Sequence, residues 1–215
     1  MTTKNLRMTI KTILFDVDGV LADFLLAFTQ LASTIDPTVK VMATKNNKLG
    51  WMLDQHMSKE TVNRTWKVID RTTNWWFHVP PLLHNYEFIR LNALTKTNRI
   101  IFCSARDEAF VNNIGNLFEG QNHIQLQTQA WLKYWGIDNP TVIMSKKKGE
   151  VANILNADFA IDDKPENAAC THWLASGCQS YLLAYNDMPG LAMFLPKRVS
   201  IVKNLEDFFD AIEKT

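Results

Sequence analysis

Short apolar runs alternate with longer helical patterns along most of the chain. The runs occupy residues 10–15, 99–103, 141–144, 158–161, 180–185 and 199–202. Continuous apolar runs of this length between polar positions are typical of strands buried on both faces of a sheet. Helical patterns at 149–155, 165–176 and 205–213 lie between or after them, and Thr128 is the predicted N-cap of a further helix that Gly136 ends. This alternation predicts an α/β fold with a doubly wound, mostly parallel sheet.

One interval, from Asp23 to about Arg90, contains no convincing strand. Ser58 is a predicted helix N-cap, and two helical stripes follow it. The stripes consist of Val62, Trp66 and Ile69, and of Leu82, Tyr86, Ile89 and Ala93. We therefore predict an α/β core of residues 1–22 and 88–215, with a helical cap of residues 23–87 inserted after the first strand. Hinges are expected near residues 22–26 and 78–86.

Composition restricts the classes of function. The 215 residues are 47% hydrophobic and 21% charged, which suits one folded domain with an insertion. Lys and Arg number 23 against 22 Asp and Glu, so no broad basic field exists to hold a polynucleotide. No run approaches the ~18 apolar residues of a membrane span, and no signal peptide is visible. Cys103, Cys170 and Cys178 form no CxxC pair, which favours reduced thiols in a cytoplasmic protein.

Polar residues follow four of the predicted strands at the point where each strand ends. They are Asp16 and Asp18, then Ser104, then Ser145 with lysines 146–148, then Asp162 and Asp163. Ligands bind beyond the carboxyl ends of the strands in open α/β sheets, so we expect these side chains to converge. Four carboxylates at one point repel one another unless a cation lies among them, and oxygen ligands without His or Cys favour Mg²⁺. With a hydroxyl and a lysine as phosphate ligands and a carboxylate as nucleophile, the set predicts Mg²⁺-dependent phosphoryl transfer.

The same residues resemble the four motifs of haloacid dehalogenase-like (HAD) phosphatases. The motifs are residues 15–20 (Phe-Asp-Val-Asp-Gly-Val), the strand-end Ser104, a downstream lysine and the pair Asp162–Asp163, in the right order. Residues 18–24, residues 130–163 and the pair Trp75-Trp76 before Pro80-Pro81 are more closely similar to one branch, the 5'(3')-deoxyribonucleotidases. The resemblance implies a Rossmann-like core with a helical cap.

The resemblance also implies catalytic roles. Asp16 would be the nucleophile that forms an aspartyl-phosphate, and Asp18 would protonate the leaving oxygen and then activate water. Asp16, Asp162 and Asp163 would hold Mg²⁺, and Asp18 would offer the metal its backbone carbonyl. An isolated Asp-x-Asp is otherwise common in a solvated turn, and the matching strand ends favour the catalytic interpretation.

The implied phosphate ligands come from three loops. Ser104, with Ala105 beside it, would bind the phosphoryl oxygens, and Gly19 lets the chain turn sharply beside the phosphate. Lys148 would neutralise the phosphoryl charge and keep the nucleophile ionised; lysines 146–147 stay open as alternatives, since a lysine run is often a solvated face.

The predicted substrate contacts are aromatic or cationic. Phe24 is either a wall for a nucleobase or a packing residue of the hinge, and one of Trp75 and Trp76 is expected to touch substrate. The other tryptophans are expected in the core or in interfaces. Arg106 stands where the nucleotidases usually have proline; it would either pair with Asp107 or Glu108 on the surface or reach an anionic group of the substrate.

The sequence thus predicts a phosphoric monoester hydrolase of the 5'-nucleotidase type, acting on nucleoside monophosphates with deoxyribonucleotides preferred. The cap would exclude water and admit a small phosphomonoester rather than a polynucleotide. Three alternatives stay open: a phosphatase for another small phosphate such as a sugar phosphate, a polynucleotide 3'-phosphatase, and a Mg²⁺-binding interaction module without activity. The sequence leaves a homodimer open as the assembly.

Overall fold

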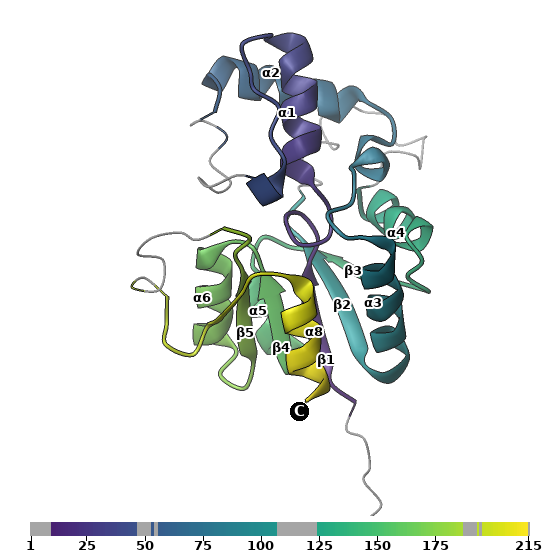
Figure 1. Ribbon diagram of the computed structural model, residues 1–215, viewed down its shortest axis with the longest axis vertical. Coiled ribbons are helices and arrows are strands. Elements are labelled where there is room, and N and C mark those ends of the chain that lie inside the picture. Colours follow the sequence, from purple (N-terminus) through teal and green to yellow (C-terminus); the bar gives the residue numbers. More distant parts are fainter. Residues whose placement is uncertain are drawn as a thin grey trace, which may run out of the picture.

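The computed structural model describes residues 10–46, 53, 56–106, 124–186, 193 and 195–214. Within these residues, parallel strands form one six-stranded sheet in the order β3-β2-β1-β4-β5-β6 (Figure 1). The strands are β1 (Thr12–Asp16), β2 (Arg99–Ser104), β3 (Thr141–Met144), β4 (Phe159–Asp162), β5 (Gln179–Leu183) and β6 (Ser200–Val202). Each overlaps one predicted apolar run, so the doubly wound parallel fold predicted from the sequence is confirmed.

Helices pack on both faces of this sheet. The helices of the described part of the chain are α1 (Phe24–Ile35), α2 (Lys59–Arg71), α3 (Asn85–Thr97), α4 (Ile124–Tyr134), α5 (Lys148–Ile154), α6 (Pro165–Leu174) and α8 (Leu205–Glu213), with the 3-10 turns η1 (Thr44–Asn46) and η3 (Trp75–His78). Ile13 and Phe15 of β1 pack in one apolar cluster with residues of α3, α4 and α8, whereas Leu14 packs in another with Ala152 of α5. Helices α3, α4 and α8 therefore cover one face, and α5 and α6 cover the other. The chain reverses its direction across the sheet between β1 and β4, and such a switch point leaves a crevice at the carboxyl ends.

Helix α4 corrects one predicted boundary. Thr128 is not the N-cap of this helix, because the described helix already includes Ile124 and the Thr128 hydroxyl donates to the Ile124 carbonyl at 2.8 Å. Thr128 is fully buried and accepts a hydrogen bond from Arg106, so a tertiary partner explains a polar residue that resembles a cap in the sequence. Gly136 ends the helix as predicted, with φ of 92° in the left-handed region that favours glycine.

Helix α3 keeps the predicted helical period but buries a different face. Tyr86 and Ile89 of the predicted stripe are 58% and 72% exposed, so this stripe does not mark the buried face of the helix. Phe88, Leu91 and Leu94 are buried instead, since these positions face β2 and α8. The apolar residues of this helix therefore extend round more than one face, and the sheet selects which of them are covered.

The tryptophans divide between core and surface. Trp131 is buried, and Trp66 and Trp135 are half-buried against the main apolar cluster, as predicted. Trp173 of α6 is 70% exposed and so is not a core residue, and its other predicted place, in an interface, stays a prediction. Trp51 lies outside the described residues.

The chain leaves the core and returns to it at one place. Helices α1 and α2 lie beyond the carboxyl edge of the sheet (Figure 1), and Ser58 caps α2 as predicted. The Asp23 amide donates to the Pro80 carbonyl at 2.7 Å, and the Leu82 amide donates to the Leu21 carbonyl at 2.8 Å. The outgoing and incoming segments are thus joined by backbone hydrogen bonds. The boundaries of the cap at residues 23 and 87 stay a prediction.

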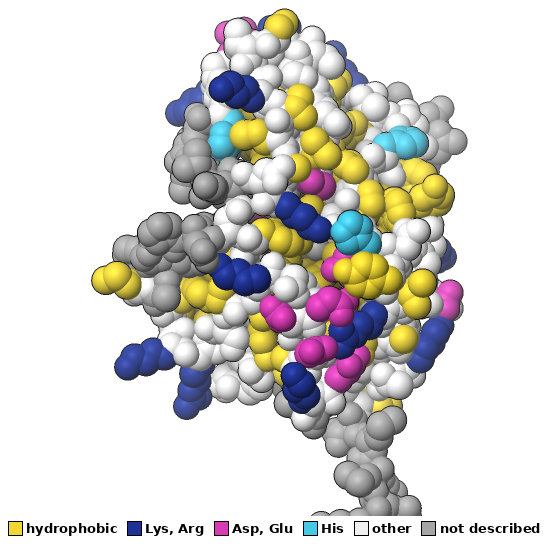
Figure 2. Space-filling view, in the orientation of Figure 1, with side chains coloured by type: hydrophobic (Ala, Val, Ile, Leu, Met, Phe, Trp, Pro, Cys, Tyr) yellow, Lys and Arg dark blue, Asp and Glu magenta, His cyan; other side chains and the backbone are white. Residues whose placement is uncertain are grey.

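Charged side chains of both signs are interspersed on the surface. Figure 2 shows acidic and basic groups side by side over α8, where Arg90 of α3 contacts Glu206, Asp210 and Glu213. This mixture agrees with the formal net charge of +1. None of the helices in the described part of the chain is long and apolar enough to cross a membrane.

Candidate active site

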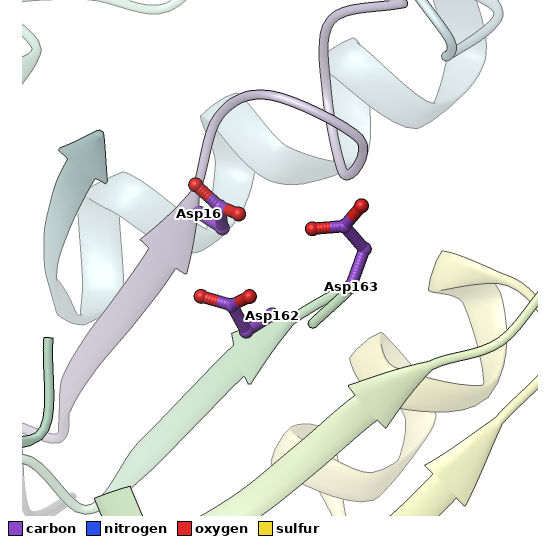
Figure 3. Close-up of side chains that lie close together, drawn as sticks. All are labelled: Asp16, Asp162 and Asp163. Carbon is purple, nitrogen blue, oxygen red and sulfur yellow. The ribbon is translucent and has the colours of Figure 1, made fainter. Parts of the chain in front are cut away.

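Three carboxylates meet at the centre of the sheet edge. Asp16 ends β1, Asp162 ends β4 and Asp163 follows directly, so all three lie at the switch point. Each offers an oxygen, and these oxygens lie within 4.8 Å of one another. Figure 3 shows the three side chains around a common space beyond the strand ends. The expected convergence of Asp16, Asp162 and Asp163 is therefore observed.

Lys148 provides the positive charge next to these acids. Its ammonium group lies 2.6 Å from an oxygen of Asp16 and 2.7 Å from an oxygen of Asp162, and the side chain is buried. Burial opposes the charged form, but the two carboxylates outweigh it and raise the pKa of Lys148 above its ordinary value. Residues 146–147 are exposed, and Lys147 pairs with Glu150. Of the three consecutive lysines, Lys148 thus contacts the acids, and its role as a phosphate ligand stays a prediction.

Burial and mutual repulsion raise the pKa values of two of these acids. Burial, and then the neighbouring Asp162, raise the pKa of Asp16 to about 7 despite the opposing effect of Lys148. Burial and the charges of Asp16 and Asp162 likewise raise the pKa of Asp163 well above its ordinary value. One oxygen of Asp163 is buried with no hydrogen-bond partner among the described residues. Clustered oxygen donors with an unsatisfied member fit a hard divalent cation such as Mg²⁺.

Local hydrogen bonds fix the orientation of these acids. The Val17 amide donates to Asp16 at 2.7 Å, and Gly19 in the following turn has φ of 87°, which favours glycine. Asp162 accepts from the Lys164 amide at 2.9 Å and from the Asn167 side-chain amide at 3.0 Å. Asn167 therefore holds the acidic loop of Asp162 and Asp163 in place.

The side chain of Asp18 lies outside the carboxylate cluster and belongs to a second group. Its two oxygens accept from Nη2 and Nε of Arg106 at 2.6 and 2.8 Å. The buried Ser104 hydroxyl donates to Asp18 at 3.1 Å and accepts from the Arg106 amide at 3.3 Å. Ala105 lies between these two residues in the same loop. Asp18, Ser104 and Arg106 are therefore brought together, as a unit beside the carboxylate cluster.

Arg106 is the residue whose environment sequence reasoning missed. Of its two predicted roles, the surface ion pair is wrong, because the side chain is only 1% exposed and pairs with Asp18; residues 107–108 lie outside the described residues. Contact of Arg106 with an anionic group of the substrate stays a prediction. Its Nη1 donates to Thr128 at 2.8 Å, and its guanidinium lies 4.4 Å from the centre of the Trp76 ring. The sequence separation of 88 positions between Asp18 and Arg106 explains why no local pattern indicated the pair.

The predicted aromatic contacts gather where the cap joins the core. Phe24 stacks with Trp66 and Trp76 at centroid distances of 5.7 and 5.8 Å and meets Trp75 edge-on at 6.0 Å. The Trp76 amide donates to the side chain of Gln127 in α4 at 3.1 Å. Packing at the hinge, one of the two roles foreseen for Phe24, is thus observed. Contact of these aromatic residues with substrate stays a prediction.

Comparisons with known proteins agree with this fold. No family model matches the chain. The mitochondrial 5'(3')-deoxyribonucleotidase of Mus musculus is 22% identical over 185 residues, covering 80% of this chain and 75% of the mouse protein. A HAD family hydrolase from Deinococcus radiodurans, solved with phosphate and sodium, has a TM-score of 0.58 at 12% identity, covering 96% of both chains. A D,D-heptose 1,7-bisphosphate phosphatase from B. bronchiseptica, solved with magnesium and phosphate, has a TM-score of 0.50 at 12% identity, covering 95% of this chain and 99% of that one. The chain therefore has the fold of the HAD-like hydrolases.

Proposed function

We propose that this protein is a Mg²⁺-dependent phosphatase that hydrolyses nucleoside monophosphates, with deoxyribonucleotides preferred, through an aspartyl-phosphate. The observation that carries the proposal is the group formed by Asp16, Lys148, Asp162 and Asp163 at the centre of the sheet edge. Phosphoryl transfer needs a nucleophile, a positive charge beside it and a set of oxygen ligands for a hard metal ion, and this group supplies all three.

In the first step, a carboxylate oxygen of Asp16 attacks phosphorus. The bond between phosphorus and the ester oxygen breaks, and that oxygen takes a proton from Asp18 to leave as an alcohol. Lys148 stabilises the negative charge of the phosphoryl oxygens, while Ser104 donates a hydrogen bond to one of them.

In the second step, water attacks the phosphorus of the aspartyl-phosphate. Asp18, now ionised, accepts a proton from the water as the bond between phosphorus and Asp16 breaks. The products are inorganic phosphate and the free Asp16 carboxylate. The two steps return Asp18 to its protonated state, so each turnover is balanced.

Asp16, Asp162 and Asp163 would hold the metal together with the backbone carbonyl of Asp18. When bound, Mg²⁺ supplies positive charge that favours ionised Asp16 and neutralises the substrate phosphate. The raised pKa of Asp16 and the unpaired oxygen of Asp163 are the features of this chain that such a cation would relieve.

The nucleotide as substrate rests on the cap junction and on the similarity to the mouse deoxyribonucleotidase. Phe24, Trp66, Trp75 and Trp76 place aromatic surface where the cap meets the core, and aromatic rings stack well on nucleobases. The balanced surface charge supports a small monoester rather than a polynucleotide.

A substrate panel tests the proposal. We expect deoxyuridine and thymidine 5'-monophosphates to release phosphate in Mg²⁺ but not in EDTA, and Asp16→Asn to be inactive while remaining folded. Preferred turnover of sugar phosphates would refute the nucleotidase function and keep the chemistry. Strong, salt-sensitive inhibition by oligonucleotides would instead favour a polynucleotide 3'-phosphatase. Loss of only a few-fold in rate in Asp16→Asn would refute the covalent step.

A further inference from the structure

The two cationic side chains of the site, Lys148 and Arg106, contact different acids. Lys148 contacts Asp16 and Asp162, whereas Arg106 contacts Asp18 alone among these acids. Both oxygens of Asp18 are engaged by the guanidinium, one at 2.6 Å and the other at 2.8 Å. A two-pronged contact of this kind fixes the plane of a carboxylate as well as its position.

The burial of the pair shows which partner faces the solvent-accessible side. The Asp18 side chain retains 17% of its exposure, whereas that of Arg106 retains 1%. The guanidinium is therefore covered, and the acid is the partner of the pair that solvent reaches.

Three further contacts hold the guanidinium itself in place. Thr128 of α4 accepts from Nη1 at 2.8 Å, the Trp76 ring covers one side at 4.4 Å, and the Arg106 amide is bonded to Ser104. These partners come from a core helix, from η3 at the end of the cap and from the β2 loop. An arginine fixed from three directions is a rigid support for the group it contacts.

We propose that Arg106 is a positioning residue that orients the carboxyl of Asp18 toward the leaving oxygen of the substrate. The inference rests on the proposed function, because it concerns the step in which Asp18 gives a proton to the ester oxygen as the bond between that oxygen and phosphorus breaks. In the structure Oδ2 of Asp18 accepts from Nε of Arg106 and from Ser104, whereas Oδ1 accepts from Nη2, so the second lone pair of Oδ1 can carry the proton while the guanidinium contact is kept. Lysine cannot replace Arg106 in this role, since one ammonium group cannot contact both oxygens of Asp18 in a fixed plane.

The test compares substrates that differ in how much they need the acid. Phenyl phosphate and p-nitrophenyl phosphate are similar in shape, but p-nitrophenolate leaves readily without a proton. The value of kcat/KM reports the steps up to transfer of phosphate to Asp16, so we would measure it for a series of substituted phenyl phosphates in Mg²⁺. We expect R106K to lose ~10- to 100-fold on phenyl phosphate and much less on p-nitrophenyl phosphate, because general acids contribute about 10²–10⁴-fold.

The matched control is R90K, since Arg90 also binds carboxylates but lies on α3 away from the site. It should leave both the rates and their dependence on the leaving group unchanged. A merely structural role for Arg106 would lower all substrates in parallel, so an unchanged slope of log kcat/KM against leaving-group pKa in R106K overturns the inference. A wild-type protein that hydrolyses neither these esters nor the nucleoside 5'-monophosphates refutes the proposed function itself.

A second variant covers the case in which R106K does not fold by circular dichroism. Thr128→Val removes the acceptor of Nη1 and leaves the arginine and Asp18 in the chain. A guanidinium released on that side orients Asp18 less firmly, so we expect the slope to steepen in the same direction by a smaller amount. A slope equal to that of the wild type would again overturn the inference.

Discussion

Replacing Lys148 by methionine removes the one charge that both Asp16 and Asp162 contact through their side chains in the described structure. The lysine is 5% exposed, and its ammonium group lies 2.6 and 2.7 Å from the two acids. Methionine fills a similar volume but leaves two buried carboxylates without their counter-charge. Removing one member of a buried ion pair typically costs about 3–5 kcal/mol, and we expect K148M to lose that much stability at pH 8 in EDTA.

Urea denaturation followed by circular dichroism measures this loss. K147M is the matched control, because Lys147 is its neighbour but pairs with Glu150 on the surface, where an ion pair contributes about 0–1 kcal/mol. The difference between K148M and wild type should shrink at pH 5, where Asp16, with a pKa of about 7, is protonated and needs no counter-charge. It should also shrink in Mg²⁺, which replaces part of the lost charge. A loss in K148M no larger than that in K147M would refute the assignment of Lys148 as the counter-charge.

Three further predictions concern pH, a hinge contact and helix packing. The pKa of Asp16 is raised from an ordinary 3.8 to about 7, so between these pH values the folded state keeps a proton that the unfolded chain releases. The free energy of unfolding in EDTA should therefore fall as the pH rises from about 4 to about 7. Asp16→Asn should flatten that fall in a series of urea denaturations at different pH values. Trp131→Phe removes the 2.7 Å hydrogen bond to the Val79 carbonyl and should lower the free energy of unfolding by about 1–3 kcal/mol in urea denaturation. A loss below about 0.5 kcal/mol would show that this hydrogen bond does not stabilise the hinge. Gly149→Ala places a Cβ 2.8 Å from a backbone carbonyl of α6 and should lower Tm by several degrees, whereas Gly177→Ala meets no atom within 4 Å and should not.

The sheet and its acids were predictable because the signals are local. A strand buried on both faces needs a continuous apolar run, and the residue after it lies at the sheet edge whatever the rest of the chain does. Asp16 and Asp162 could therefore be placed near each other from the sequence alone, whereas the choice among lysines 146–148 stayed open until the structure placed Lys148 against both acids. Their distances and the orientation of each side chain required the structure.

The remaining features depend on distant partners. Arg106 has acidic neighbours in sequence, but its partner is Asp18, 88 residues away, and no local pattern encodes that choice. Tyr86 and Ile89 are apolar yet exposed, because an apolar side chain at the surface costs little and the sheet covers another face of α3. Thr128 resembles a cap until its partner Arg106 is known.

The hydrogen bonds that join residues 21–23 to residues 80–82 affect how readily the segment between them can be altered during evolution. Since the two ends of the intervening segment are already held together, lengthening or replacing it costs the core little chain entropy. Asp16, Lys148 and Asp162 lie outside that segment and would keep their geometry through the exchange. Recognition of a new phosphate ester can therefore be acquired by exchange of this segment while these three residues are kept, and the contact of Trp76 with Arg106 is the part that a new segment would have to replace.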